Sequence, residues 1–348
     1  AIDALVRLGE PADAQVLLRL LFEGPPDEQA AARSSLSRMP GRPVSAAIAE
    51  ATGGATAQPC ATLIEILSQR RAAETVPRIL PLAVGADPQV RAAAIDALGK
   101  LAGPEHIPAM LEVVIQAEEG RQREAAEKAV MFVCGRIADP HKRAAPLLAA
   151  IQGLGPADRA ALLPTLGRVG GEAARPSVEA AIAIRDPAVH EAGIRALCNW
   201  PDASVAPRLI ELAQADAHPE HRVALLRALV RVAPLPDGRT DAERLALLQK
   251  AMALCTRDAE RTLVLRRAAA IRTVETLRFL LPYLDTPHAA AACQTVVELA
   301  HHRTLREPNK AEFDRALDRV IETSKDATVI DRAGRYKRGQ TWAAPTTP

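Results

Sequence analysis

A proline recurs along this chain in one local setting, and its spacing limits the folds that the chain can adopt. Each copy precedes an apolar run with helical periodicity, and a proline is tolerated in the first turn of a helix because the amide there has no partner. Successive copies lie 31, 38, 30 and 31 residues apart. This spacing predicts a fold that grows by repetition of a helical unit. The five prolines are Pro77, Pro108, Pro146, Pro176 and Pro207.

A second signature follows these helices. Residues 87–91 read Asp-Pro-Gln-Val-Arg and precede an apolar stripe, and residues 186–190 repeat the pattern 99 residues later, which is three units of 33. Residues 218–222 are a degenerate copy. In each full copy Asp caps a new helix, and Pro takes the first helical position.

Reading outward from these anchors predicts successive helical hairpins separated by Gly- and Pro-rich turns. No stretch alternates β-branched residues with period two, so we expect no sheet. The expected helix pairs span 12–23 and 26–38, 43–52 and 57–69, 73–84 and 87–101, 104–117 and 120–137, 141–153 and 156–169, 172–184 and 187–199, 202–214 and 219–233, 241–255 and 258–270, and 273–284 and 287–303.

Composition supports this all-α class. At 348 residues the chain is long for a single compact core. Hydrophobic residues make up 48% of it but aromatic residues only 2%, which suits helices packed at regular spacing more than a large irregular core. The net charge of +2 comes from interspersed charges of both signs, and no apolar stretch reaches the roughly 20 residues of a membrane span.

The pattern resembles the HEAT-repeat family, especially the short bacterial HEAT-like repeats also found in phycobilin lyases. The resemblance implies an α-solenoid, a right-handed superhelix of about nine to ten stacked antiparallel hairpins. It implies a ladder of Asp–Arg pairs between repeats, although His190 and His218 depart from the motif. The motif residues are Pro77, Asp87, Pro88, Val90, Arg91, Ala94 and Leu98, and the ladder would fall on Asp87, Arg91, Asp186 and Arg222.

The chain is expected to divide into a HEAT-like solenoid over residues 1–303, a capping helix over 304–325, and a basic, Pro/Thr-rich tail or linker over 326–348. Asn309 and Glu312 have the spacing of a capping box. The tail could be a partly ordered linker or a basic interaction segment that carries Trp342. Residues 1–5 repeat the letters of residues 94–98, which suggests a chain cut from a longer protein.

Residues for chemistry are sparse. The sequence contains no phosphate loop, dinucleotide fingerprint or Gly-x-Ser-x-Gly elbow. Five scattered cysteines read as small buried hydrophobes, with a reactive thiol as the alternative. His218 and His221 lie three apart without the further ligands that zinc needs. We therefore expect no catalytic, cofactor-binding or metal-binding residues.

We expect a non-catalytic protein-binding scaffold, with its partner surface on the second helices of the hairpins and Trp200 either packing between hairpins or anchoring an interface. The alternative is a nucleic-acid-binding or lyase- or glycosylase-like repeat enzyme. Nucleic acid is disfavoured because acids flank the basic spots and only two tryptophans are present. We further expect a monomer that forms part of a larger bacterial protein, either cytoplasmic or extracytoplasmic, whose partner the sequence does not identify.

Overall fold

The computed structural model describes residues 11–215 and 218–342, and every regular element in those residues is a helix. The all-α solenoid class predicted from the repeat spacing is confirmed. The chain forms two compact units, residues 1–196 and 197–348, divided near the end of one helix. The pentapeptide of residues 1–5 lies outside the described residues. No helix in the described part of the chain is long and apolar enough to cross a membrane.

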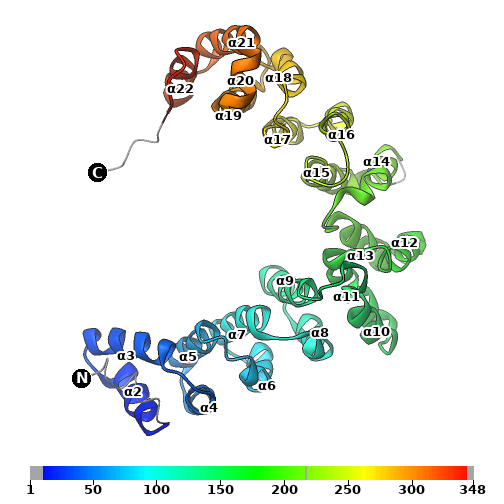
Figure 1. The fold of residues 1–348 in the computed structure, drawn as a ribbon. Coiled ribbons are helices and arrows are strands. Elements are labelled where there is room, and N and C mark those ends of the chain that lie inside the picture. The colour runs from blue at the N-terminus through cyan, green and yellow to red at the C-terminus, as the bar shows by residue number, and fades with distance from the viewer. Residues whose placement is uncertain (1–10, 216–217, 343–348) are drawn as a thin grey trace. The chain divides into compact units, whose positions relative to one another are not determined.

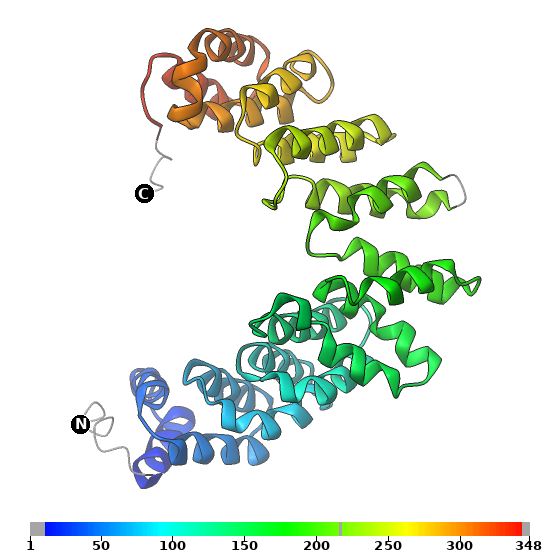
Figure 2. The same cartoon turned by 45° about the vertical axis from the view of Figure 1, so that its right-hand side comes forward.

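Unit 1 is a stack of helical hairpins (Figure 1, Figure 2). Second helices of successive hairpins pack on one another and form one layer, and the first helices form the other. The first helices are α2 (Pro11–Glu23), α4 (Arg42–Ala51), α6 (Val76–Ile79), α8 (Ile107–Gln116), α10 (Ala145–Gln152) and α12 (Arg175–Ala183). The second helices are α3 (Pro26–Arg38), α5 (Ala57–Gln69), α7 (Pro88–Leu101), α9 (Arg121–Gly135), α11 (Pro156–Val169) and α13 (Pro187–Cys198).

Unit 2 continues the hairpin pattern and ends in further helices. Its first helices are α14 (Ala206–Gln214), α16 (Asp241–Leu254) and α18 (Val274–Leu280), and its second helices are α15 (Arg222–Val232), α17 (Asp258–Ala268) and α19 (Ala289–His301). The chain then forms α20 (Arg303–Arg306), α21 (Lys310–Thr323) and α22 (Ala327–Lys337). Both α21 and α22 pack against α19.

The recurrent proline marks a change of backbone geometry within the first helices. Short 3₁₀ turns precede several of them, such as Ala73–Thr75 before α6 and Pro104–His106 before α8. Pro77 and Pro108 then occupy the start of the α-helical part, where a missing amide costs little. The expected first helices therefore exist, but several begin as 3₁₀ turns.

The last segment corrects the expectation of a linker. Residues 327–337 form α22, because the Asp326 carboxylate accepts hydrogen bonds from the amides of Thr328 and Val329 at 2.8 and 3.3 Å. Val329, Ala333 and Tyr336 then lie on one face and are buried. The basic residues near the end of this helix thus belong to an ordered amphipathic element.

The predicted capping box at Asn309 is wrong. The Asn309 side chain donates instead to the Leu305 carbonyl at 2.8 Å, because a 3₁₀ turn leads into α21 and leaves Asn309 without the extended backbone of a cap. Glu312 turns away and binds Arg278 at 2.7 Å.

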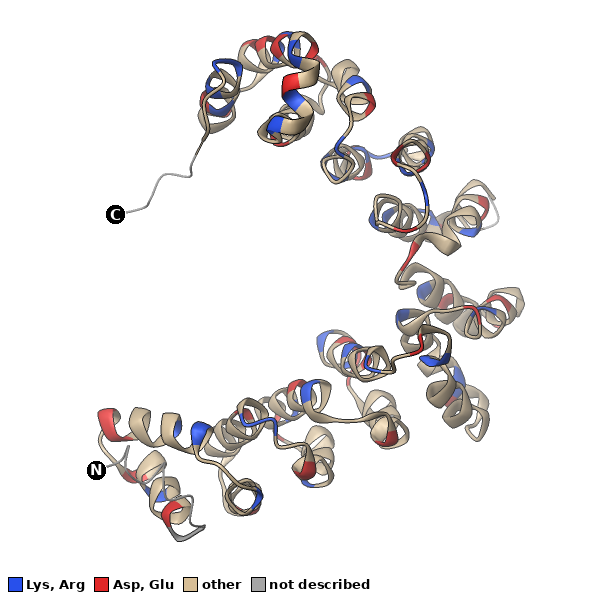
Figure 3. Cartoon of the chain, viewed as in Figure 1, with Lys and Arg blue, Asp and Glu red and all other residues tan. Residues whose placement is uncertain are grey.

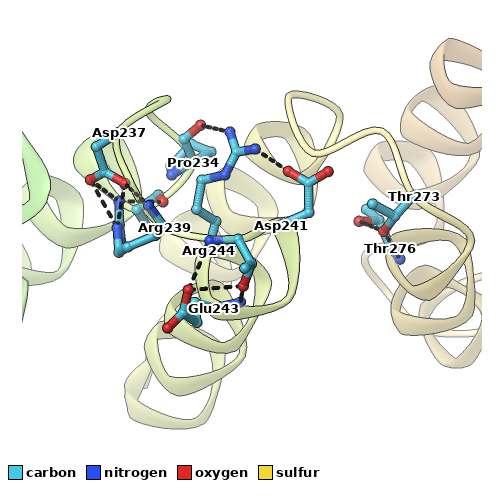
Figure 4. Close-up of polar contacts among 10 residues, drawn as sticks. Pro234, Asp237, Arg239, Asp241, Glu243, Arg244, Thr273 and Thr276 are labelled. Atoms are coloured by element: carbon cyan, nitrogen blue, oxygen red, sulfur yellow. Dashed lines mark hydrogen bonds and ion pairs between the residues drawn. The ribbon is translucent and has the colours of Figure 1, made fainter.

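A capping box does form at α16, after the loop that follows α15 (Figure 4). Thr240 accepts from the Glu243 amide at 3.3 Å, and Glu243 accepts from the Thr240 amide at 2.7 Å, which lowers the pKa of the Glu243 carboxyl. Within the same loop Arg239 donates to Asp237 at 2.8 Å, and this bond lowers the pKa of Asp237. The loop is thus held by side-chain contacts of its own.

Gly167 sets the spacing of two second helices in unit 1. A Cβ added there would lie well inside van der Waals contact of the Ala196 backbone, so α11 and α13 touch at this residue. The helix ends two residues later, and Gly170 and Gly171 follow with φ of 67° and 89°, as expected for a helix C-cap and turn.

Gly167→Ala should destabilise the protein by about 1–3 kcal/mol, because the added methyl group meets backbone atoms that can move only by separating two helices. Chemical denaturation monitored by circular dichroism measures the change. Gly135→Ala is the matched control: Gly135 closes α9, and a Cβ added to it would meet no heavy atom within 4 Å. That control should be neutral or slightly stabilising. Equal denaturation midpoints for the two variants would contradict the close approach of α11 and α13 at Gly167.

Candidate functional site

The second-helix layer of unit 1 carries an apolar groove between α7 and α9, here called the α7–α9 groove. It encloses about 460 Å³, and Ile95, Gly99, Ala129 and Phe132 contribute to its lining. Phe132 is 57% exposed, although a phenyl ring of this size is ordinarily buried. A concave apolar site with an exposed aromatic ring is typical of a surface that another molecule covers.

Small residues create this groove. A Cβ added to Gly99 would lie 3.3 Å from the Cα of Ala129, so the two helices approach closely at that level. The same added Cβ would lie 3.8 Å from the ring of Phe132, which is one turn further along α9. Because neither Gly99 nor Ala129 has a side chain large enough to fill the space above the contact, the helix surfaces leave a hollow beside the ring.

Charged side chains line the rim of the groove. Lys100 is paired with Asp96 at 2.6 Å, and Arg91 with Glu118 at 3.1 Å. Arg121 and Lys128 are exposed, and neither forms an ion pair within the described residues. The rim therefore has an excess of positive charge over an apolar floor.

A buried carboxylate links the α9 side of the groove to the next two second helices. Glu127 is 0% exposed, and its two oxygens accept from Arg168 of α11 at 2.7 Å and from Arg195 of α13 at 3.3 Å. A buried carboxylate is tolerated only when it is paired in this way. The contact holds α9, α11 and α13 in register within unit 1.

The motif residues do not form the Asp–Arg ladder that the resemblance implied. Asp87 caps its own helix by accepting from the amides of residues 89 and 90 at 2.9 and 3.0 Å, and Asp186 does the same for residues 188 and 189. Both carboxylates accept hydrogen bonds within their own helix, because the first amides of a helix have no backbone partner and an N-cap Asp lies next to them.

The two motif arginines bind backbone carbonyls, and Arg91 also pairs with Glu118 of the next repeat at 3.1 Å. Arg91 donates to the carbonyls of Gly85 and Ala86 at 3.0 and 2.7 Å, and Arg222 donates to the Leu254 carbonyl at 3.0 Å. The predicted roles of Asp87, Arg91, Asp186 and Arg222 in a ladder are corrected accordingly: they stabilise helix ends and loops.

A different set of arginines connects successive repeats. An arginine near the end of one second helix donates to the last carbonyls of the preceding second helix or the turn after it, about one repeat earlier in the chain. Arg70 reaches Leu36, Met39 and Gly41; Arg136 reaches Gly99 and Ala102; Arg231 reaches Cys198 and Trp200; Arg267 reaches Arg231.

The sequence analysis missed this arrangement. Its signal was an arginine recurring near the C-terminal end of second helices, which is also where arginine is favoured by the helix dipole alone. The spacing between donor and acceptor, from 29 to 37 residues, is close to the repeat length.

Trp200 is not an interface anchor. Its side chain is 1% exposed, and its indole N–H donates to the Ser204 hydroxyl at 3.2 Å. A residue that is buried within its own chain cannot serve as an exposed hot spot. Of the two hypotheses for Trp200, the structure supports internal packing.

The cysteines are small packed residues in the structure. Four are buried, and Cys198 is of intermediate exposure. Burial raises the pKa of Cys134 to about 11 and that of Cys198 to about 12, so both stay protonated and unreactive near neutral pH. His218 and His221 lie just before α15 with ring centroids 5.7 Å apart, and Glu220 lies beside His218 at 3.2 Å.

Arg70→Met should lower the free energy of unfolding by roughly 1–3 kcal/mol, because three helix-end carbonyls of the preceding repeat lose their donor. Arg42→Met is the control, since the exposed Arg42 side chain makes no hydrogen bond or ion pair within the described residues, and it should stay within about 0.5 kcal/mol of the parent. Urea denaturation provides the comparison. If Arg70→Met lowered the free energy of unfolding no more than Arg42→Met does, these hydrogen bonds would make no net contribution to stability.

Comparison with known proteins gives both a family match and structural neighbours. The family model for HEAT repeats matches residues 47–131. No curated protein sequence matches the chain. The structure of Kap95p, in a study of its binding to RanGDP, aligns over 97% of this chain and 50% of that one, with a TM-score of 0.51 and 14% identity.

Two further structures are similar at lower scores. The archaeal HEAT-like repeats protein from Thermococcus onnurineus NA1 is 17% identical, with 65% of this chain and 96% of that chain aligned and a TM-score of 0.30. Human deoxyhypusine hydroxylase is 16% identical, with 95% and 97% aligned and a TM-score of 0.29. The α7–α9 groove lies largely in the segment that matches the family model. Residues 47–131 therefore match HEAT repeats, and the chain shares the helical-solenoid fold of Kap95p.

Proposed function

We propose that this chain is a non-catalytic protein-binding scaffold and that its partner occupies the α7–α9 groove. The observation that carries the proposal is Phe132, a large apolar side chain held 57% exposed beside an apolar hollow. Solenoids of stacked hairpins use such concave second-helix surfaces for binding. The groove lies between two second helices, which is where we expect a partner surface.

The lining indicates the chemistry of the partner. The floor offers apolar surface of Ile95, Ala129 and Phe132, which would accept an aliphatic or aromatic anchor. Arg121 and Lys128 at the rim carry charges that no carboxylate of the described residues neutralises. The partner is therefore an apolar segment flanked by acidic residues, such as an amphipathic helix lying between α7 and α9.

The rival function is a repeat enzyme that acts on nucleic acid or a small substrate. An extended basic track would favour that function, whereas both signs of charge are interspersed along the helices of each unit (Figure 3). The buried Glu127 carboxylate is bound by two arginines that link helices, which supports a structural role over general acid–base chemistry.

Phe132→Ala should weaken partner binding at least tenfold, about 1.4 kcal/mol, because the ring is the largest apolar group available to fill the interface. Ligands selected from a displayed library of acidic, amphipathic helical peptides would be measured by fluorescence anisotropy. Phe22→Ala is the matched control: Phe22 is 38% exposed on α2 and does not line the groove, so its variant should bind within about twofold of the parent.

A crosslinking experiment locates the bound peptide independently. A photoreactive residue at Lys128 should capture it, whereas the same residue at the exposed Glu112 on α8 should not. Selected peptides that bind both phenylalanine variants equally and crosslink from Glu112 would place the partner surface elsewhere and reject the groove.

A further inference from the structure

Unit 2 contains a pocket in which basic side chains from four segments of the chain converge, here called the basic pocket. It encloses about 390 Å³. The end of α17 contributes Arg266 and Arg267, the loop before α18 contributes Arg272, and α22 contributes Arg332. His301 and His302 at the end of α19 complete the basic set, and Glu298 is the acidic residue of the lining.

Carboxylates neutralise several other arginines of unit 2, but they do not neutralise the arginines of this pocket in the same way. Arg278 is bound to Glu312 at 2.7 Å, and Arg319 to Asp285 at 2.6 Å. In contrast, the side chains of Arg266, Arg272 and Arg332 form no ion pair and donate no hydrogen bond to any described residue. The Glu298 carboxylate accepts from Gln294 at 2.9 Å and binds none of the pocket arginines within the described residues.

Helix-end electrostatics explains only part of this cluster. The C-terminal ends of α17 and α19 attract cations, which accounts for Arg266, Arg267 and His301 one by one. Arg272 lies in a loop, and Arg332 lies in the middle of α22, so neither is placed by a helix end. They nevertheless open onto the same pocket.

Two features hold the pocket in a defined geometry. The Arg332 guanidinium lies 4.8 Å from the centre of the Trp342 ring and 6.0 Å from that of Tyr336, so stacking restricts its rotation. Arg267 is fixed by donating to the Arg231 carbonyl at 2.9 Å. A binding site whose donors are already placed loses less conformational entropy when a ligand arrives.

The positive charge of the pocket affects the pKa of His302, which lies in its lining. The pKa of His302 is lowered, first by burial and then by the charges of Arg272 and His301. A bound anion would oppose the last two effects and stabilise the charged imidazolium.

We propose that the basic pocket is a phosphate-binding site for a small anionic molecule, with Arg266, Arg272 and Arg332 as its principal donors. Guanidinium groups approaching from different directions suit the several oxygens of a phosphate or diphosphate better than the two oxygens of one carboxylate. The basic groups are gathered around one open hollow, and Glu275 and Glu312 flank Arg278 outside it, so the charge does not extend as a track along which a nucleic acid strand would bind.

Isothermal titration calorimetry with inorganic pyrophosphate tests the site on the full chain. Parent protein should bind saturably, and Arg272→Gln should weaken binding at least tenfold. Arg303→Gln is the matched control, because Arg303 is 80% exposed, pairs with Glu307 and does not line the pocket; it should bind within about twofold of the parent. No saturation by about 10 mM pyrophosphate, or equal affinity for the two variants, would overturn the proposal.

Two further ligands separate the possible sources of the phosphate. Inorganic phosphate and glycerol phosphate distinguish a free anion from an organic phosphate ester, and either one losing affinity in Arg272→Gln supports the site. A single-stranded oligonucleotide that binds more tightly than pyrophosphate, and that depends on Arg272, would replace the proposal with a nucleic-acid site.

Histidine NMR titration gives a readout other than affinity. Saturating pyrophosphate should raise the pKa of His302, and Arg272→Gln alone should also raise it, because that variant removes one of the charges that lower it. A His302 pKa that does not move in either case would place the anion away from this pocket. The charged and titratable groups facing His302 across the pocket are Arg266, Arg267, Arg272, Glu298, His301 and Arg332.

Discussion

Every helix end leaves carbonyl groups without a partner, and a stack of short helices produces such ends at every repeat. At four second-helix ends of this protein, an arginine of a later second helix supplies donors for these carbonyls. Arg70, for example, bridges from the end of α5 to the end of α3 and the turn after it, and Arg136 from α9 to α7. Because each bond spans one repeat, the same interaction satisfies a helix end and fixes the position of the next layer. Apolar burial drives the stacking, and these bonds define its register.

The proposed binding surface of unit 1 follows from how closely neighbouring second helices approach each other. Where Gly99 meets Ala129, or Gly167 meets Ala196, two second helices come into backbone contact. Such contacts leave little side-chain volume on the exposed side of the second helices, and a large side chain nearby, such as Phe132, then stands exposed beside a hollow. The α7–α9 groove is thus a consequence of the same small residues that permit tight stacking, and a partner would complete the packing that the repeat leaves open.

The sequence predicted the hairpins well because their signals are local. Asp87 and Pro88 specify a helix start whatever surrounds them, and the period of apolar residues specifies which face is buried. It predicted the pairing between repeats poorly. The Asp87 carboxylate binds the amides of residues 89 and 90 at the start of its own helix, so it does not pair with an arginine of another repeat. The partners of Glu127 lie 41 and 68 residues away, and no local pattern indicates that distance. Burial of Trp200 and the ordering of α22 likewise depend on neighbours in space.

Whether an arginine has a partner within the chain distinguishes ordinary surface from candidate sites in this protein. Most arginines of the described residues are bound to a carbonyl or a carboxylate of the chain itself. Against that background, an unneutralised group of guanidiniums such as Arg266, Arg272 and Arg332 is an exception within unit 2. Clustered like charges destabilise a fold, so such a cluster is retained most readily when an anion offsets it. The same reasoning applies to the exposed Phe132 in unit 1. The arginine cluster lacks a counter-charge and the phenyl ring lacks apolar cover among the described residues. The first therefore indicates an anionic ligand, and the second an apolar partner.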